Sequence, residues 1–164
     1  MRTIKFKGKC LIPKNGKETA YGSLLMYPDG TTTIFENIRA SEFYCIGVAP
    51  TTVCQFTGFH DKNGKEIYEG DVLRSDEYPF SSVKDGKRDN YFGIVFYSEE
   101  GAAFGIMAAK NHEFRTRGIF DGVSYGISQD KLKDFEVIGN IHEEEWKQYR
   151  EYVQTEEEKE AKDD

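Results

Sequence analysis

The chain has 164 residues, of which 38% are hydrophobic and 14% are aromatic, and its formal net charge is −7. This length allows one domain or two small subdomains. Residues 143–164 hold ten acidic and four basic side chains, which leaves 19 acidic and 18 basic side chains in the rest of the chain. The main body is therefore almost neutral and lacks the basic excess of a general nucleic-acid-binding protein.

The cysteines indicate a reduced protein. Cys10, Cys45 and Cys54 are odd in number, and no two of them have the Cys-x-x-Cys spacing. The sequence shows no signal-peptide pattern and no apolar run long enough to cross a membrane. We expect a cytoplasmic protein that does not contact a membrane.

The N-terminal residues alternate between apolar and basic side chains, which predicts a half-buried strand over residues 3–12. The first 17 positions hold six basic residues and no acidic one: Arg2, Lys5, Lys7, Lys9, Lys14 and Lys17. We interpret the lysines as protection of an edge strand against self-pairing. The alternative is an arm that binds nucleic acid or an acidic partner.

Turn signals separate the next strands. Turns at residues 13–16 and 27–30 flank predicted strands at 19–27 and 31–35. Residues 36–53 show poor periodicity, and we interpret them as a joint with at most one helical turn, near residues 41–44 or at Pro50. The pentapeptide Lys-Asn-Gly-Lys-Glu occurs at residues 14–18 and again at 62–66 with unlike flanks, which indicates two independent hairpin turns.

The second copy of the pentapeptide contains a strong turn signal, Asn63-Gly64, since glycine accepts a positive φ and asparagine tolerates it. A two-residue loop would place Lys62 opposite Lys65. A three-residue loop places Asp61 opposite Lys65 and puts Gly64 at a left-handed bulge, so opposite charges face each other. We predict the three-residue loop.

The chain after this turn is predicted to form a second β unit. Gly70 turns the chain and Asp71 can accept hydrogen bonds from backbone amides, as at the start of many small SH3-like barrels. We predict a long polar loop at 75–90, strands at 91–97 and 102–108, a second excursion at 110–129, a short turn capped by Ser128 and a closing strand at 135–141.

The C-terminal segment, residues 143–164, favours a helix. Trp146, Tyr149 and Val153 form an apolar stripe, and charged side chains dominate beyond Thr155. Such a helix docks on a second subunit or folds back on its own domain. Amphipathicity marks a buried face without indicating whose surface buries it.

One short motif resembles a catalytic centre. Residues 122–126, Gly-Val-Ser-Tyr-Gly, match the nucleophile elbow of α/β-hydrolases, which works between a buried parallel strand and a helix. No βα units precede Ser124, and His142 is the one histidine after it. We therefore do not assign Ser124 as a nucleophile.

A metal site could be built from Cys45, Cys54 and His60, because zinc accepts these ligands. Their spacing is not that of a zinc finger or ribbon, and small buried cysteines are the favoured interpretation. No phosphate-binding or dinucleotide-binding glycine motif occurs. We assign no catalytic, cofactor-binding or metal-binding residue, and we expect no enzymatic activity, no cofactor and no small-molecule substrate.

The best candidate binding surface is the loop at residues 111–120, which interleaves Arg115 and Arg117 with phenylalanines. Charge combined with aromatic stacking is how barrels hold single-stranded nucleic acid. With Lys110 and the N-terminal lysines, the loop would form a nucleic-acid-binding surface. It would equally serve as a loop that orders against a neighbouring subunit.

A long motif occupies the central part of the chain, Gln55-Phe56-Thr57-Gly58 followed by Asp61-Lys62-Asn63-Gly64-Lys65-Glu66-Ile67-Tyr68-Glu69-Gly70-Asp71-Val72. Together with residues 2–9, 21–24, 50–53 and 135–141, it resembles the signature of the YopX-like family of phage and prophage proteins. The resemblance implies a β-rich protein, encoded on a phage or an integrated element, whose C-terminal half is an SH3-type barrel. The family is functionally uncharacterised, so the resemblance implies no activity and no catalytic residues.

These observations predict a mainly β protein. A β subdomain of residues 1–54 packs on an SH3-like β-barrel of residues 55–142, and an acidic amphipathic helix and tail follow at 143–164. The expected function is that of a phage or prophage accessory protein in the cytoplasm of the bacterial host. We expect a non-enzymatic module that forms a homo-oligomer or binds a host or phage protein, and a nucleic-acid-binding barrel is the alternative.

Overall fold

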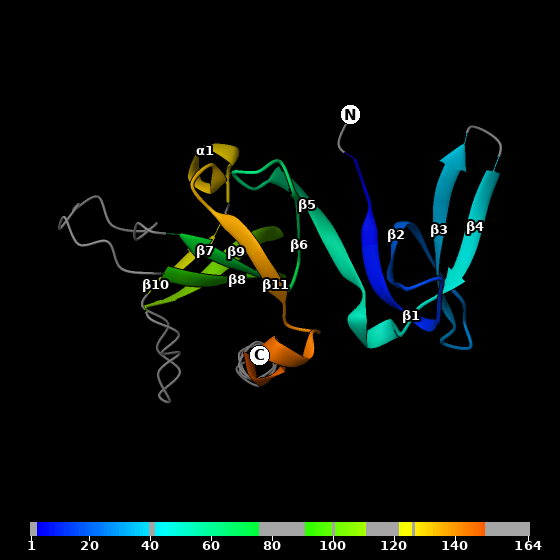
Figure 1. The fold of residues 1–164 in the computed structure, drawn as a ribbon. Coiled ribbons are helices and arrows are strands. Elements are labelled where there is room, and N and C mark those ends of the chain that lie inside the picture. The colour runs from blue at the N-terminus through cyan, green and yellow to red at the C-terminus, as the bar shows by residue number, and fades with distance from the viewer. Residues whose placement is uncertain are drawn as a thin grey trace. The chain divides into compact units, whose positions relative to one another are not determined.

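The computed structural model of the chain describes residues 3–39, 42–75, 91–99, 101–110, 122–125 and 127–149. The chain forms two compact units, Met1–Gly58 and Phe59–Asp164. Two antiparallel sheets and very little helix make up these units (Figure 1). The predicted mainly β fold is confirmed.

The described part of the chain contains two sheets and three short helices. The first sheet has the order β4-β3-β2-β1-β5-β6, with β1 (Phe6–Lys14), β2 (Lys17–Met26), β3 (Thr32–Arg39), β4 (Glu42–Gly47), β5 (Cys54–His60) and β6 (Glu66–Tyr68). The second has the order β10-β9-β8-β7-β11, with β7 (Asp71–Ser75), β8 (Tyr91–Ser98), β9 (Ala103–Lys110), β10 (Gly122–Tyr125) and β11 (Glu136–Asn140). The helices are the 3₁₀ helices η1 (Pro50–Thr52) and η2 (Glu144–Tyr149) and the single turn α1 (Gln129–Leu132).

A small apolar core holds the first unit together. Its fully buried members are Ala20, Ile34 and Val48, and Phe6, Cys10, Leu24, Ile46 and Val53 pack against them. The β1–β2 hairpin turns at Asn15 and Gly16, whose φ angles are 54° and 75°. Two successive positive φ angles suit a two-residue turn, and Lys14 accordingly pairs with Lys17.

Two expectations for the first unit are wrong. β1 pairs with both β2 and β5, so its lysines do not protect an edge strand. Residues 36–53 do not form a joint, because β3 continues to Arg39 and β4 follows as the strand at the sheet's edge. Phe43 and Tyr44 are neighbours on β4 and are both exposed, so this strand lacks the alternation by which a sequence reveals a strand. The helical turn predicted at Pro50 is confirmed as η1.

The second unit has its own apolar core. The buried members are Ile67, Leu73, Val95, Phe104, Ile106, Ile127, Leu132, Phe135 and Val137, and Phe59 packs against them. The predicted hairpin of β8 and β9 is confirmed. The short turn after Ser128 forms as α1, but the Ser128 side chain makes no capping hydrogen bond, so the predicted cap is wrong. Within the described residues no hydrogen-bonded pairing joins β10 to β11, so a closed SH3-like barrel is not confirmed.

The predicted C-terminal helix is described in its first part, where it forms the 3₁₀ helix η2 rather than an α-helix. Trp146 of η2 is buried, and Gly139 of β11 makes room for it, because a Cβ atom at Gly139 would lie 2.2 Å from the indole Nε1. This segment therefore packs on the sheet of its own unit. Residues 150–164, and residues 76–90 of the predicted polar loop, lie outside the described residues.

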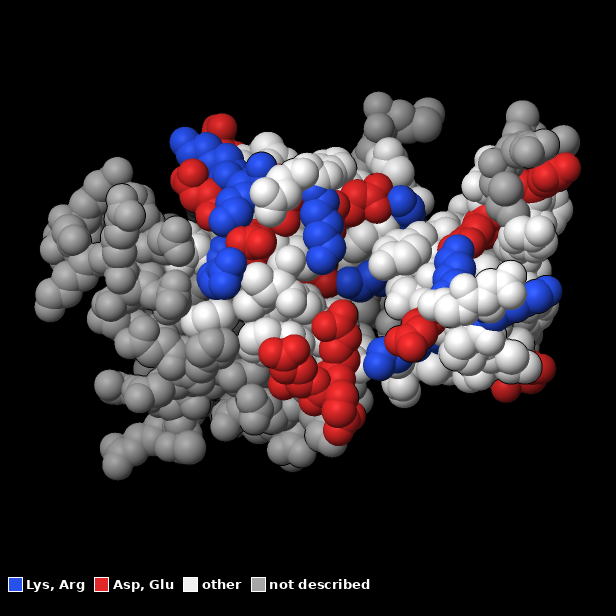
Figure 2. Space-filling model, viewed as in Figure 1, with Lys and Arg blue, Asp and Glu red and all other residues white. Residues whose placement is uncertain are grey.

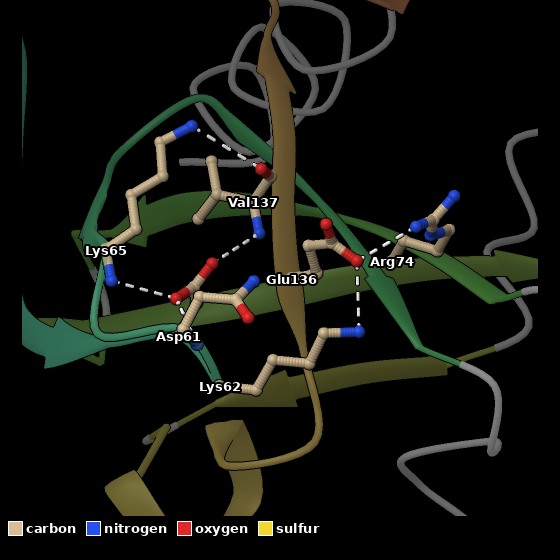
Figure 3. Close-up of polar contacts among 7 residues, drawn as sticks. Asp61, Lys62, Lys65, Arg74, Glu136 and Val137 are labelled. Carbon is tan, nitrogen blue, oxygen red and sulfur yellow. Dashed lines mark hydrogen bonds and ion pairs between the residues drawn. The ribbon is translucent and has the colours of Figure 1, made fainter.

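The turn after β5 has the predicted register, for a different physical reason. The Asp61 N–H donates to Lys65 O at 2.8 Å, and Gly64 has a φ of 79°. The Asp61 carboxylate, however, does not pair with the Lys65 ammonium. Its Oδ1 accepts the backbone N–H of Asn63 at 2.8 Å and that of Lys65 at 2.9 Å (Figure 3). The carboxylate thus holds the turn through backbone amides.

The same turn covers the outer edge of β11. The Oδ2 atom of Asp61 accepts the Val137 N–H at 3.0 Å, and the Lys65 Nζ donates to Val137 O at 3.4 Å (Figure 3). The Lys62 N–H donates to Phe135 O at 2.8 Å. A turn and two of its side chains therefore take the hydrogen-bonding position that a further strand would occupy beside β11.

A second buried carboxylate closes the corner into β7. As predicted, Asp71 accepts a backbone amide, with Oδ2 receiving the Tyr68 N–H at 2.7 Å. Its Oδ1 accepts Asn140 Nδ2 at 3.0 Å. Gly70 has a φ of 70° and accepts the Ile141 N–H at 2.9 Å. The corner and the end of β11 are thus fixed to each other by side-chain and backbone hydrogen bonds.

Asp61→Asn is expected to destabilise the second unit. The amide keeps one oxygen for the two turn amides, but its NH₂ group then faces the Val137 N–H, and a buried donor without an acceptor costs about 1–3 kcal/mol. Guanidinium unfolding followed by circular dichroism measures the loss. Asp29→Asn is the matched control, since Asp29 Oδ1 accepts the Thr31 N–H at 2.9 Å in an exposed turn and asparagine can do the same. Equal effects of the two substitutions would contradict this role.

Glu136 is expected to make stability depend on pH. Its Oε2 lies 3.0 Å from Lys62 Nζ and 2.9 Å from Arg74 Nη2 (Figure 3). The hydrogen bond from Lys62 contributes most to lowering the pKa of Glu136 below its ordinary value of 4.5, and the hydrogen bond from Arg74 contributes next. A carboxyl with a lowered pKa in the folded state contributes stability that is present above pH 4.5 and is lost as the pH falls through the folded value. Urea unfolding at a series of pH values should therefore show Glu136→Gln less stable than the parent at pH 7. The difference should disappear in acid, and a difference that does not change with pH would refute the assignment.

Candidate functional site

A groove of 980 Å³ opens in the first unit between the second half of β1 and the edge strand β4. Its walls come from Cys10, Leu11, Ile12 and Pro13 on one side and from Tyr44, Cys45, Ile46 and Gly47 on the other. Most of these side chains are apolar. A concave surface with apolar walls and few polar groups is the usual form of a binding site.

The charged side chains that line the groove are those of Lys14, Lys17 and Glu36. The Glu36 side chain is 11% exposed, and Lys17 Nζ forms an ion pair with its Oε2. The Oε1 atom accepts the Tyr21 N–H at 2.7 Å. Because both oxygens have donors, this carboxylate ties β3 to the β1–β2 hairpin and is poorly placed to act as a general base.

Two of the three cysteines line the groove, and they differ in exposure. Cys45 is exposed and Cys10 is half-buried, whereas Cys54 is buried outside the groove. The expectation of buried cysteines is thus right for Cys54 and wrong for Cys45. Burial raises the pKa of the Cys10 thiol, the Glu36 carboxylate raises it further, and Lys17 opposes the shift.

The other candidate residues of the sequence do not assemble into a reactive centre in the described parts of the chain. No group of three or more His, Cys, Asp or Glu side chains there could hold a metal ion. Ser124 lies within β10, opposite Ile106 of the antiparallel strand β9, so its backbone is not the strand-to-helix turn of a nucleophile elbow. Arg115 and Arg117 lie outside the described residues, and nucleic-acid binding through that loop stays a prediction.

Large apolar side chains are exposed mainly on the first unit. Nine of the ten described examples lie there: Ile4, Leu11, Ile12, Tyr21, Leu25, Met26, Tyr27, Phe43 and Tyr44, with Tyr97 the exception. Much of the face of this unit seen in Figure 2 carries neither charge colour. Phe43 and Tyr44 could not be predicted as part of this surface, because β4 lies in a region without periodicity. Ile4 and Ile12 lie in the segment predicted as a half-buried strand, and both are exposed.

Helices of the described residues are all too short or too polar to span a bilayer.

Cys45 is expected to react first with a thiol reagent. It is exposed, whereas Cys10 has a raised pKa and therefore less of the reactive thiolate, and Cys54 is buried. Mass spectrometry after brief treatment with iodoacetamide at pH 7.5 should find one label, on Cys45. Cys45→Ser should remove that fast phase, and rapid labelling that persists in this variant would contradict the exposure order.

Comparison with known proteins assigns the chain to a family but indicates no activity for it. The family model described as YopX protein matches residues 14–145. No curated protein matches the chain. Among solved structures, protein EF1440 from Enterococcus faecalis is similar, with 20% sequence identity and a TM-score of 0.44, and the match covers 89% of this chain and 99% of that one. Since the family model matches most of the sequence, from the β1–β2 hairpin to η2, the chain belongs to the YopX protein family.

Proposed function

We propose that this protein is a non-enzymatic module that binds another protein or assembles with itself. The proposal includes a phage or prophage origin and action in the cytoplasm of the bacterial host, which the resemblance of residues 55–72 to phage and prophage proteins supports. It also includes an SH3-like barrel in the second unit. The strand order β10-β9-β8-β7-β11, with α1 just before the last strand, supports that architecture.

The observation that carries the proposal is the exposed apolar surface of the first unit. Ile12 is 83% exposed, Phe43 is 66% exposed and Tyr44 is 65% exposed. Single exposed apolar residues are ordinary, but a set of them on β1 and β4, the two strands that flank the groove, is typical of an interaction surface. A small unit that exposes so many aromatic and aliphatic side chains gains stability when another protein covers them.

The chemistry of the described residues supports a role without catalysis. The buried carboxylates accept hydrogen bonds from structural donors, as Asp61, Asp71 and Glu36 show. An active site instead pairs a nucleophile or base with an open position for substrate. The groove offers apolar contact area and an open strand edge, which suit recognition of a polypeptide.

Site-specific photo-cross-linking in the host cell tests this function. A benzophenone amino acid at position 12 or 43 should give adducts of discrete mass, because both side chains lie on the proposed interaction surface. The same amino acid at position 97 is the control, since Tyr97 is the exposed large apolar residue among the described residues of the second unit. No adduct at 12 and 43, or equal adducts at all three positions, would refute the proposal.

A further inference from the structure

The groove of the first unit is a partly open seam between two strands. An isolated bridge pairs Cys10 of β1 with Val48, and the Ala49 N–H donates to Lys9 O at 2.9 Å. Leu11 still lies beside Gly47, since its Cδ1 atom is 3.5 Å from the position that a Cβ atom would take there. Beyond Leu11 no residue of β1 pairs with β4 within the described residues, and the two strands separate and enclose the groove.

Pro13 contributes to this separation. It lies in the half of β1 that faces the groove, and it has no N–H to donate to a neighbouring strand. The pairing of β1 with β2 also changes register between Lys9 and Lys14. Both features turn the second half of β1 away from regular pairing, so the seam stays open beyond the Cys10 bridge.

The backbone of β4 presents unpaired groups to the groove. Val48 donates its N–H to Thr32 O of β3 at 3.0 Å. Successive residues of a strand direct their backbone groups to opposite sides, so those of Cys45 and Gly47 point away from β3. Ala49 is two residues after Gly47, so its N–H also points away from β3, and it donates to Lys9 O on β1.

The strands on both sides of the groove indicate what kind of segment fits in it. A segment between two strands needs a free backbone edge on each of its sides. A single extended segment has two free edges. The β4 strand of a second copy has one, because its other edge is paired with β3. Strand addition to a sheet edge, with alternate side chains in pockets, is a common mode of peptide recognition.

The charges of the groove indicate which side chains a bound segment should carry. Lys17 is neutralised by Glu36, whereas no ion pair with Lys14 occurs within the described residues. The first unit, Met1–Gly58, holds seven basic and four acidic residues, a net charge of +3. Its groove is therefore complementary to an acidic segment, and its apolar walls require apolar side chains at alternate positions.

We propose that an extended segment of a partner protein, with alternating apolar and acidic residues, adds as a strand to β4 and occupies this groove. Its backbone bonds to the outward groups of Cys45, its apolar side chains contact Leu11 and Tyr44, and a carboxylate meets Lys14. This inference rests on the proposed protein-binding function and names the class of partner.

Two blocked peptides test the proposal on the full-length chain: Glu-Val-Glu-Val-Glu-Val-Glu and its counterpart with lysine in place of glutamate. Cys45 reports occupancy, because it lines the groove and is exposed. At about 1 mM, a concentration at which weak peptide complexes form, the acidic peptide should slow alkylation of Cys45 several-fold and the basic peptide should not. Equal protection by both peptides would overturn the charge argument.

Substitutions locate the site by fluorescence anisotropy of the labelled acidic peptide. Lys14→Glu should weaken binding about fivefold, the effect of reversing one exposed charge, whereas Lys133→Glu on the second unit should not. Cys45→Pro removes an outward N–H without removing a bond to β3 and should bind about tenfold more weakly than Cys45→Ser, which keeps that N–H. Unchanged binding in Lys14→Glu would overturn the proposal even if the proline variant folds poorly.

The remaining outcomes separate this inference from the proposed function. If neither peptide protects Cys45 while cross-links persist at positions 12 and 43, the inference fails and the protein-binding function stands. If Cys45 becomes protected as the concentration of the chain alone rises, and sedimentation shows a dimer, the occupant is a second copy and the inference fails. If both protection and cross-links are absent, both proposals fail.

Discussion

A strand at the edge of a sheet has one row of backbone groups without a partner, and the second unit depends on how these groups are bonded at β11. Asp61 is buried, with 5% of its surface exposed, and its carboxylate accepts hydrogen bonds from its own turn and from Val137. One side chain thus fixes a hairpin turn and covers a strand that lies 76 positions away in the sequence. Without that carboxylate, the turn would lose the acceptor of two of its amides, and the Val137 N–H would be buried without an acceptor, which is the costly condition in a protein interior.

The pentapeptide that occurs twice shows how far a local sequence determines a turn. At residues 14–18 the chain turns in two residues, Asn15 and Gly16, and both have a positive φ. At residues 62–66 the turn is a three-residue loop in which Gly64 alone has a positive φ. The residue before each copy differs. Pro13 cannot donate a hydrogen bond, whereas Asp61 accepts two from the loop, so the same five residues adopt two geometries.

The edge strand β11 of the second unit and the edge strand β4 of the first unit differ in how their free backbone groups are covered. A turn and its side chains cover β11, whereas β4 keeps an open edge beside exposed aromatic side chains and a groove. Natural proteins generally protect an edge with charges, prolines or bulges, because an open edge invites pairing with another chain. An edge left open beside an apolar groove is therefore consistent with a surface that another polypeptide covers. This contrast connects the fold of a YopX family member to the proposed binding function.

The sequence also indicated several features for reasons that the structure confirms. Alternating side chains and glycine turns indicated most of the strands, since the side chains of a half-buried strand alternate between core and solvent. The joint predicted at residues 36–53 failed because β4 lies at an edge and exposes Phe43 and Tyr44 in succession. The groove could not be predicted, since it depends on where β1 and β4 separate after the Cys10 bridge.

By itself, the sequence determined the class of fold, the positions of the tight turns and the family, because these depend on local backbone preferences and on a long contiguous motif. The tertiary structure alone decided which strand lies at an edge, which cysteine is exposed and which carboxylates are bonded. These properties depend on contacts between residues far apart in the chain. No local pattern shows that β1 lies between two strands, or that the Asp61 carboxylate bonds to Val137 rather than to the lysine opposite it.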